Sequence, residues 1–298
     1  MPLLPYLQLM RPANVVTAAA DILLGAVAAY ALAGHASAHR ILPEEGGLGW
    51  LLLASCALYA GGVVLNDVFD AGIDREERPE RPIPSGRIGV RRAALFGALL
   101  LLLGLVAAGM AGTRSGWIAV LTAAFILLYD AYAKQHAWFG PLTMGLCRGG
   151  NLLLGLSILP LSTAGLALAG LPVLYIFAIT LISRGEVGGG NRRSLYLALA
   201  IYSLVVLIML TLLLGSGHSI LLGLPFILLF GRMIFPPLWR AVQEPSGPRI
   251  GQAVRSAVLA LIVFDAALGA ALAGWPAGLM IIVLLPFSLI LGAFFAVT

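Results

Sequence analysis

Residues 48–74 read LGWLLLASCALYAGGVVLNDVFDAGID, an apolar run that carries no charge until it ends in a cluster of acids. The stretch 48–69 is about as long as the ~20 residues that a helix needs to cross a bilayer. Lipid offers no hydrogen-bond partners to the backbone, and the run is too long and too uniform for a barrel strand. It therefore predicts a transmembrane helix whose polar end reaches the membrane surface.

Similar runs recur along the whole chain, which has 298 residues, 60% of them hydrophobic and 10% charged. No polar stretch is long enough for a second, soluble domain. The expected fold is an all-α, polytopic membrane protein with nine to ten transmembrane helices, in one domain that covers 1–298. The predicted helices are 14–34, 48–69, 92–112, 115–133, 138–160, 165–184, 194–215, 218–238, 253–273 and 276–296.

Basic residues fall almost entirely on one side of the predicted membrane. If the helices alternate in direction, all but three of the 18 Lys and Arg residues share the side of the amino terminus, the exceptions being Arg40, Arg114 and Arg148. Positive charge marks the cytoplasmic side. We therefore expect a multi-pass protein of the cytoplasmic membrane, with its amino terminus and polar loops in the cytoplasm. Because topology accounts for the charge, nucleic acid is not an expected partner.

The acids at the end of the 48–69 run are spaced for one helix face. At about 100° per residue, Asp67, Asp70 and Asp74 fall within an arc of roughly 60°, with Asn66 at its edge. Carboxylates this close repel one another unless a cation neutralises them, and oxygen ligands favour Mg²⁺ held together with substrate phosphates. The alternative is an acidic helix end that is simply solvated.

Other polar groups are expected on the same side. Arg78 and Arg81 follow the acids in a proline-rich loop and can bind phosphate oxygens in bidentate fashion, although topology alone also explains such charge. Further candidates lie at the end of the 115–133 helix and in the loop after 165–184. These residues are Tyr129, Asp130, the single lysine Lys134, Arg184 and Glu186. The glycines after Glu186 predict either a mobile lid or a plain connector.

Arg148 lies inside a predicted helix, with Asn151 one turn later on the same face. A guanidinium at that depth needs a polar cavity or a partner, and Asp21 or Asp265 would serve as a buried structural pair. Asn14 shares a helix face with Asp21, and it is a further candidate for substrate binding.

The order of these motifs resembles the UbiA superfamily of intramembrane prenyltransferases over nearly the whole chain. Asn66, Asp67, Asp70 and Asp74 match its Asn-Asp-x-x-Asp-x-x-x-Asp motif. The segment 81–86 is similar to its Arg-Pro-rich loop, 11–14 to its opening, and Tyr129 with Lys134 to its tyrosine–lysine element. The family's second Asp-x-x-x-Asp motif is reduced here to Glu186. That departure, with the segment 148–151, resembles an EboC-like branch associated with cyclitol-type metabolites.

The resemblance implies helices in a ring around a central cavity, and Mg²⁺-dependent transfer of a prenyl group from an isoprenoid diphosphate to a small acceptor, a cyclitol or polyol or an aromatic. It implies three roles. The Mg²⁺ ligands would be Asn66, Asp67, Asp70, Asp74 and Glu186; the catalytic residues Lys134, Tyr129 and Asp130; and the substrate-binding residues Asn14, Arg78, Arg81, Arg148, Asn151 and Arg184. The alternatives are a transporter-like protein that binds an anionic lipid, and a non-catalytic relative.

Overall fold

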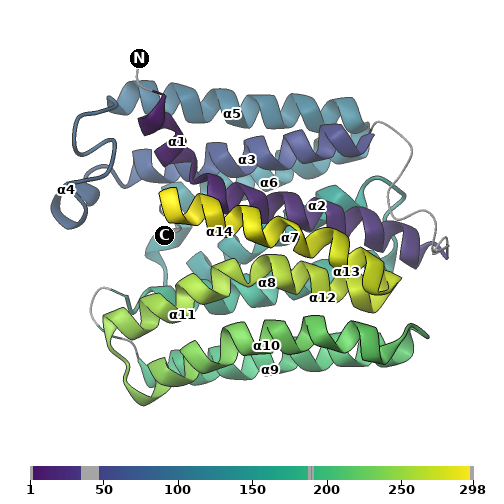
Figure 1. Ribbon diagram of the computed structural model, residues 1–298. Coiled ribbons are helices and arrows are strands. Elements are labelled where there is room, and N and C mark those ends of the chain that lie inside the picture. Colours follow the sequence, from purple (N-terminus) through teal and green to yellow (C-terminus); the bar gives the residue numbers. More distant parts are fainter. Residues whose placement is uncertain (1–2, 35–46, 187–188, 190, 296–298) are drawn as a thin grey trace.

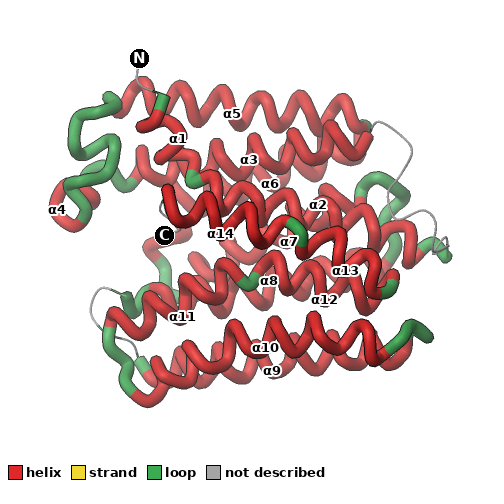
Figure 2. The backbone as a smooth tube through the Cα atoms, viewed as in Figure 1, coloured by secondary structure: helices red, strands yellow, loops and turns green. Residues whose placement is uncertain are grey.

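The computed structural model describes residues 3–34, 47–186, 189 and 191–295, and it is helical throughout this part, with no strand (Figure 1, Figure 2). The first half of the chain forms α1 (Leu4–Met10), α2 (Pro12–Leu32), α3 (Gly47–Phe69), α4 (Asp74–Glu77), α5 (Val90–Ala111), α6 (Thr113–Ala131), the short 3₁₀ helix η1 (Ala133–Gln135) and α7 (Phe139–Leu156). The second half forms α8 (Thr163–Ser183), α9 (Arg192–Gly215), α10 (Ile220–Gln243), α11 (Gly247–Leu259), α12 (Leu261–Ala273), α13 (Trp275–Ile282) and α14 (Leu284–Phe294).

Eight described helical segments are long and apolar enough to cross a membrane, and a ninth results if α11 and α12 form one span. These two helices meet at Ala260 with a bend of 41°. All ten predicted ranges contain helix. The last one is divided into α13 and α14, and its final residue, 296, lies outside the described residues. The prediction of an all-α membrane protein is confirmed.

α7 is the exception among the long helices, because its composition is too polar for a candidate membrane-spanning helix. It lies in the middle of the bundle and packs against α2, α6 and α8. Glycines permit this close packing: a Cβ on Gly155 would sit 2.8 Å from the carbonyl oxygen of Ile22 in α2, and one on Gly145 would sit 2.6 Å from that of Val173 in α8. Protein rather than lipid therefore surrounds the polar residues of α7.

The apolar core has two main parts, and α2 and α7 belong to both. One part joins them to α3, α5 and α6, and the other joins them to α8 through α13. Figure 1 shows the same order, with α5 at one edge, α9 and α10 at the other, and α2 and α7 between them. The second part contains an aromatic cluster around the fully buried Tyr175, whose ring stacks on Phe264 with a centroid distance of 5.1 Å. The functional residues lie where these two parts meet.

Candidate functional site

A cavity of about 390 Å³ opens between the two parts of the bundle. Arg11, Asn66, Arg78, Arg81, Asp130 and Glu186 form a polar rim around it. Its walls are largely apolar and include Leu58, Ile126, Met144, Ile176, Ile179, Val254, Val258 and Leu261. The rim belongs to the end of the bundle where α1, α4 and the start of α11 lie (Figure 1). From Asn66 the wall continues along α3 to Tyr59, seven residues or about 10 Å of helix deeper.

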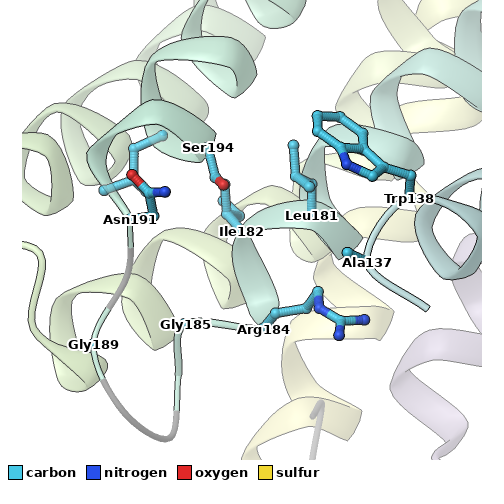
Figure 3. A pocket seen from close by; sticks show the side chains of 10 residues that line it. Ala137, Trp138, Leu181, Ile182, Arg184, Gly185, Gly189, Asn191 and Ser194 are labelled. Carbon is cyan, nitrogen blue, oxygen red and sulfur yellow. The ribbon is translucent and has the colours of Figure 1, made fainter. Parts of the chain in front are cut away.

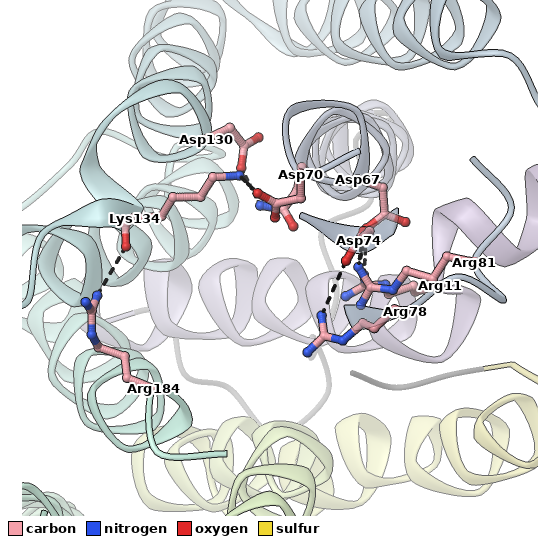
Figure 4. Close-up of polar contacts among 10 residues, drawn as sticks. Arg11, Asp67, Asp70, Asp74, Arg78, Arg81, Asp130, Lys134 and Arg184 are labelled. Carbon is pink, nitrogen blue, oxygen red and sulfur yellow. Dashed lines mark hydrogen bonds and ion pairs between the residues drawn. The ribbon is translucent and has the colours of Figure 1, made fainter. Parts of the chain in front are cut away.

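Two of the motif's carboxylates are buried against arginines (Figure 4). Asp67 Oδ1 accepts hydrogen bonds from Arg11 Nη2 at 2.8 Å and from Arg81 Nη1 at 3.3 Å. The same Arg81 atom donates to Asp74 Oδ2 at 2.8 Å, and Arg78 Nη1 lies 3.9 Å from Asp74 Oδ1. Only 4% of Asp67 and 2% of Asp74 are exposed. The alternative of a solvated acidic helix end is therefore wrong for these two residues.

Asp70 belongs to a different group of contacts. Its Oδ1 lies 2.6 Å from Lys134 Nζ, while the neighbouring Asn66 donates from Nδ2 to Asp130 Oδ1 at 2.8 Å (Figure 4). The predicted helix is not continuous through the motif, because α3 ends at Phe69 and a turn separates it from α4. Asp67 and Asp74 share Arg81, whereas Asp70 pairs with the lysine that follows α6.

The donor set of this rim fits Mg²⁺ by its chemistry. It offers carboxylate oxygens and the Asn66 amide oxygen, and Asp130 Oδ2 is buried without a hydrogen-bond partner in the described part of the chain. Within the described residues, no three His, Cys, Asp or Glu side chains converge as a finished metal site. This arrangement is compatible with Mg²⁺, which typically takes one or two carboxylates and completes its coordination with water and substrate phosphate.

Glu186 reaches the same cavity from the end of α8, as the sequence predicted for a residue of the second acidic motif. Burial raises the pKa of its carboxyl group, and the nearby Arg78 and Arg255 offset part of that rise. The glycine-rich segment that follows, predicted as a lid or a connector, includes residues 187, 188 and 190, which lie outside the described residues.

Arg148 and Asn151 lie both at the cavity and in a buried polar cluster. They line the cavity, together with Asn14. They also form a buried polar cluster, since Arg148 Nε lies 2.6 Å from Asp21 Oδ2 and Asn151 Nδ2 donates to the same oxygen at 2.7 Å. The structural pairing of Arg148 with Asp21 is thus present in a residue that also lines the cavity.

Five of the predicted site residues are not among those that line the cavity: Asp67, Asp70, Asp74, Lys134 and Arg184. Arg184 is exposed and donates to the carbonyl oxygens of Lys134 and His136 at 3.1 and 3.2 Å, which connects the end of α8 to η1. It borders a smaller pocket of about 260 Å³, whose rim includes Trp138, Asn191 and Ser194 (Figure 3). The structure thus does not bring Arg184 together with the other predicted substrate-binding residues.

Sequence reasoning missed several residues of the cavity wall, among them Tyr59, Thr122 and Cys147. Tyr59 could have been found by its spacing, because it precedes Asn66 by two helical turns and so shares its face. Thr122 precedes Tyr129 by the same interval on α6. Cys147 could have been found in the same way, because it precedes Asn151 by one turn of α7.

Comparison with known proteins agrees with this geometry. The profile of the UbiA prenyltransferase family matches residues 22–254. The digeranylgeranylglyceryl phosphate synthase of Methanococcoides burtonii is 34% identical over 151 residues, which are 50% of this chain and 53% of that protein. The chain thus spans about half the length of this curated relative.

Solved structures share the fold. One, described as giving insights into the biosynthesis of digeranylgeranylglyceryl phosphate synthase in membranes, has a TM-score of 0.66 and 23% identity, and the match covers 91% of this chain and 98% of that one. A UbiA homologue from Archaeoglobus fulgidus bound to DMAPP and Mg²⁺ has a TM-score of 0.59 and 18% identity over 90% and 98% of the two chains. With a family match that covers well over half of its length, this chain belongs to the UbiA prenyltransferase family.

Proposed function

We propose that this protein transfers a prenyl group from an isoprenoid diphosphate to a hydroxyl acceptor inside the membrane, with Mg²⁺ as cofactor. The observation that carries the proposal is a single cavity with a rim of arginines and acids and with apolar walls. Such a cavity suits a donor that has a charged head and a hydrocarbon tail. Membership of the family and the Archaeoglobus fulgidus homologue bound to DMAPP and Mg²⁺ support it.

The donor's diphosphate would lie at the rim. Asn66, Asp67, Asp70, Asp74 and Glu186 are the proposed ligands of Mg²⁺, which would offset the charge on the leaving diphosphate. Arg81 would contribute directly, because its guanidinium binds two carboxylates here and could bind two oxygens of an arriving diphosphate in the same bidentate way. Lys134 would supply a second cation from beside Asp70.

The deeper cavity would shield the reacting carbon from water. Ile126, Ile176 and Ile179 form apolar walls suited to the isoprenoid chain. The rings of Tyr59 and Tyr129 also line this space, and aromatic faces attract the positive charge that develops on an allylic carbon. Asp130 is the proposed base, since its Oδ2 is buried, has no hydrogen-bond partner in the described chain and belongs to a residue of the cavity wall. It would accept the proton of the acceptor's hydroxyl group.

The proposed acceptor is a glyceryl phosphate lipid. The comparisons give no support to the cyclitol or aromatic acceptor, nor do they single out the EboC-like branch, whereas the curated relatives are named for a product that contains a glyceryl phosphate. The cavity also lies beside more cations than one diphosphate requires: Arg11, Arg78 and Arg81 are at its rim and Arg148 is on its wall. A second phosphate would be well accommodated there.

The decisive experiment is transfer by the purified protein in lipid nanodiscs. Prenyl diphosphates of several lengths would be offered with Mg²⁺ and three acceptors: a prenylated glyceryl phosphate, a cyclitol and a hydroxybenzoate. We expect diphosphate release and a digeranylgeranyl-type ether with the first acceptor only, and loss of both when the metal is chelated. Donor that binds without any release of diphosphate, at every donor length, would instead indicate a non-catalytic relative.

The proposed orientation places the rim in the cytoplasm. It rests on the positive-inside bias of the basic residues. Single cysteines introduced at the exposed Glu76 of α4 and at the exposed Ser219, which precedes α10 at the opposite end of the bundle, would test it in sealed right-side-out vesicles. A reagent that cannot cross membranes should label the second site from outside and the first only after lysis.

A further inference from the structure

A cluster of one cation and two acids is buried beside the cavity. Arg148 of α7 places Nε 2.6 Å from Asp21 Oδ2 of α2, and its Nη2 lies 3.9 Å from Asp265 Oδ2 of α12. Asp21 is 1% exposed and Asp265 is wholly buried. Three helices thus contribute unequal numbers of positive and negative groups to one site inside the membrane.

The two acids have very different partners. Asp21 Oδ2 is held by Arg148 and by the amide of Asn151, whose Nδ2 donates at 2.7 Å. Neither oxygen of Asp265 receives a hydrogen bond from any donor in the described chain. Asp265 shares its neighbour with Asp21, since both carboxyl groups approach the same Arg148 guanidinium.

Other groups nearby cannot supply the missing donor. The Tyr175 hydroxyl, which faces this region from α8, donates to the carbonyl oxygen of Ala257 at 2.9 Å. Arg148 uses Nη1 for the Thr17 hydroxyl at 3.1 Å and Nη2 for the Thr17 carbonyl oxygen at 2.8 Å. Tyr59, on α3, is the remaining titratable group near Arg148 and Asp21. Since no donor of the described chain reaches either Asp265 oxygen, the group left to pair with Asp265 is Asp21, which shares the Arg148 guanidinium with it.

Two carboxyl groups can form a hydrogen bond only when one of them carries a proton. A second unpaired carboxylate at this depth would also be very costly, because an ionised group removed from water loses far more hydration energy than one cation at 3.9 Å returns. We propose that Asp265 is a protonated carboxylic acid that donates to Asp21, so that Arg148 and Asp21 form the only charged pair of the cluster.

Asp265 is then a positioning residue for the cavity. Its proton fixes the Asp21 carboxylate, which in turn holds Arg148 where the guanidinium reaches the cavity wall. This consequence for turnover rests on the proposed function, whereas the protonation itself does not. A neutral side chain that can donate a hydrogen bond should therefore preserve the position of Arg148 and the activity. An apolar side chain of similar size should preserve neither.

Infrared spectroscopy of the purified, folded protein tests the protonation directly. At neutral pH the wild type should show the C=O stretch of a protonated carboxyl group, and Asp265→Asn should lose it. Asp130→Asn, a change in another buried acid, should leave this band in place. In Asp21→Asn the band should also disappear although Asp265 is still present, because Asp265 is then the only counter-ion of Arg148 and must ionise. A purely space-filling role for Asp265 gives no such reciprocal loss.

Transfer and melting measurements complete the test. Asp265→Leu should lower kcat/KM by at least about tenfold, since it leaves a buried acceptor on Asp21 unsatisfied, and Asp265→Asn should restore most of that loss and the melting temperature. An unchanged band in Asp265→Asn would overturn the proposal. The proposal would also be overturned if the wild type lacked the band and its melting temperature depended on Na⁺ or K⁺. A metal cation, not a proton, would then balance the charge of the acids. If the wild type transfers no prenyl group, the infrared and melting results still decide the protonation.

Discussion

Asp67 and Asp70 are both proposed to be essential for transfer, but the structure predicts that their removal has different effects on stability. Asp67→Ala removes the shared acceptor of Arg11 and Arg81, whereas Asp70→Ala removes the partner of Lys134 alone. The Asp67 side chain is 6% exposed and that of Asp70 is 24% exposed. Both variants should lose turnover, and only the first should unfold more easily.

The size of the difference follows from burial. Removal of one partner from a fully buried ion pair costs about 3–5 kcal/mol. Because the side chains of Arg11 and Arg81 remain 16% and 14% exposed, water can solvate part of the freed charge, and we expect about 2–3 kcal/mol for Asp67→Ala. The side chains of Asp70 and Lys134 are 24% and 17% exposed, so water partly solvates this ion pair. Such a pair contributes at most about 1 kcal/mol to stability.

The assay is thermal or denaturant unfolding in detergent, run beside Mg²⁺-dependent transfer with excess donor. Glu76→Ala is the matched control, since Glu76 is an exposed acid of α4 in the same region, and it should leave both readouts near those of the wild type. Near-normal transfer by Asp70→Ala would refute its role in holding the metal. An Asp67→Ala protein as stable as Glu76→Ala would refute the reasoning from burial.

Three further predictions follow from other parts of the site. Lys134→Met should lower kcat by about 10²–10³ with little change in the melting temperature, as for loss of one donor to a developing oxyanion; a change in KM alone would contradict its role. Cys147 lines the cavity, so bound prenyl diphosphate should slow its alkylation by N-ethylmaleimide, whereas the alkylation rate of Cys56, which does not line it, should not change. Gly155→Ala should destabilise the bundle by about 1–3 kcal/mol through overpacking, since its Cβ would sit 2.8 Å from the backbone of α2, whereas Gly170→Ala, with nothing within 4 Å, should be neutral or stabilising.

The sequence alone determined the class of fold and singled out several residues that line the cavity. In lipid, the backbone of an apolar run of about 20 residues can satisfy its hydrogen bonds only as a helix, and all ten predicted ranges contain helix. Asn66, Asp130, Arg78, Arg81 and Glu186 were predicted from residue type and position, and they line one cavity. They gather there because a charged group in so apolar a chain needs a polar cavity or a partner, while their roles stay predictions.

Only the tertiary structure decided how those residues pair. Helical periodicity placed Asp67, Asp70 and Asp74 on one face, yet α3 ends at Phe69, and Asp70 pairs with Lys134 rather than Arg81. No local pattern relates Asp21, Arg148 and Asp265, which come from three helices far apart in sequence. Helix period specifies which residues share a face, but the partner across a helix interface depends on how glycine-lined helices such as α2 and α7 approach each other, and that is a property of packing.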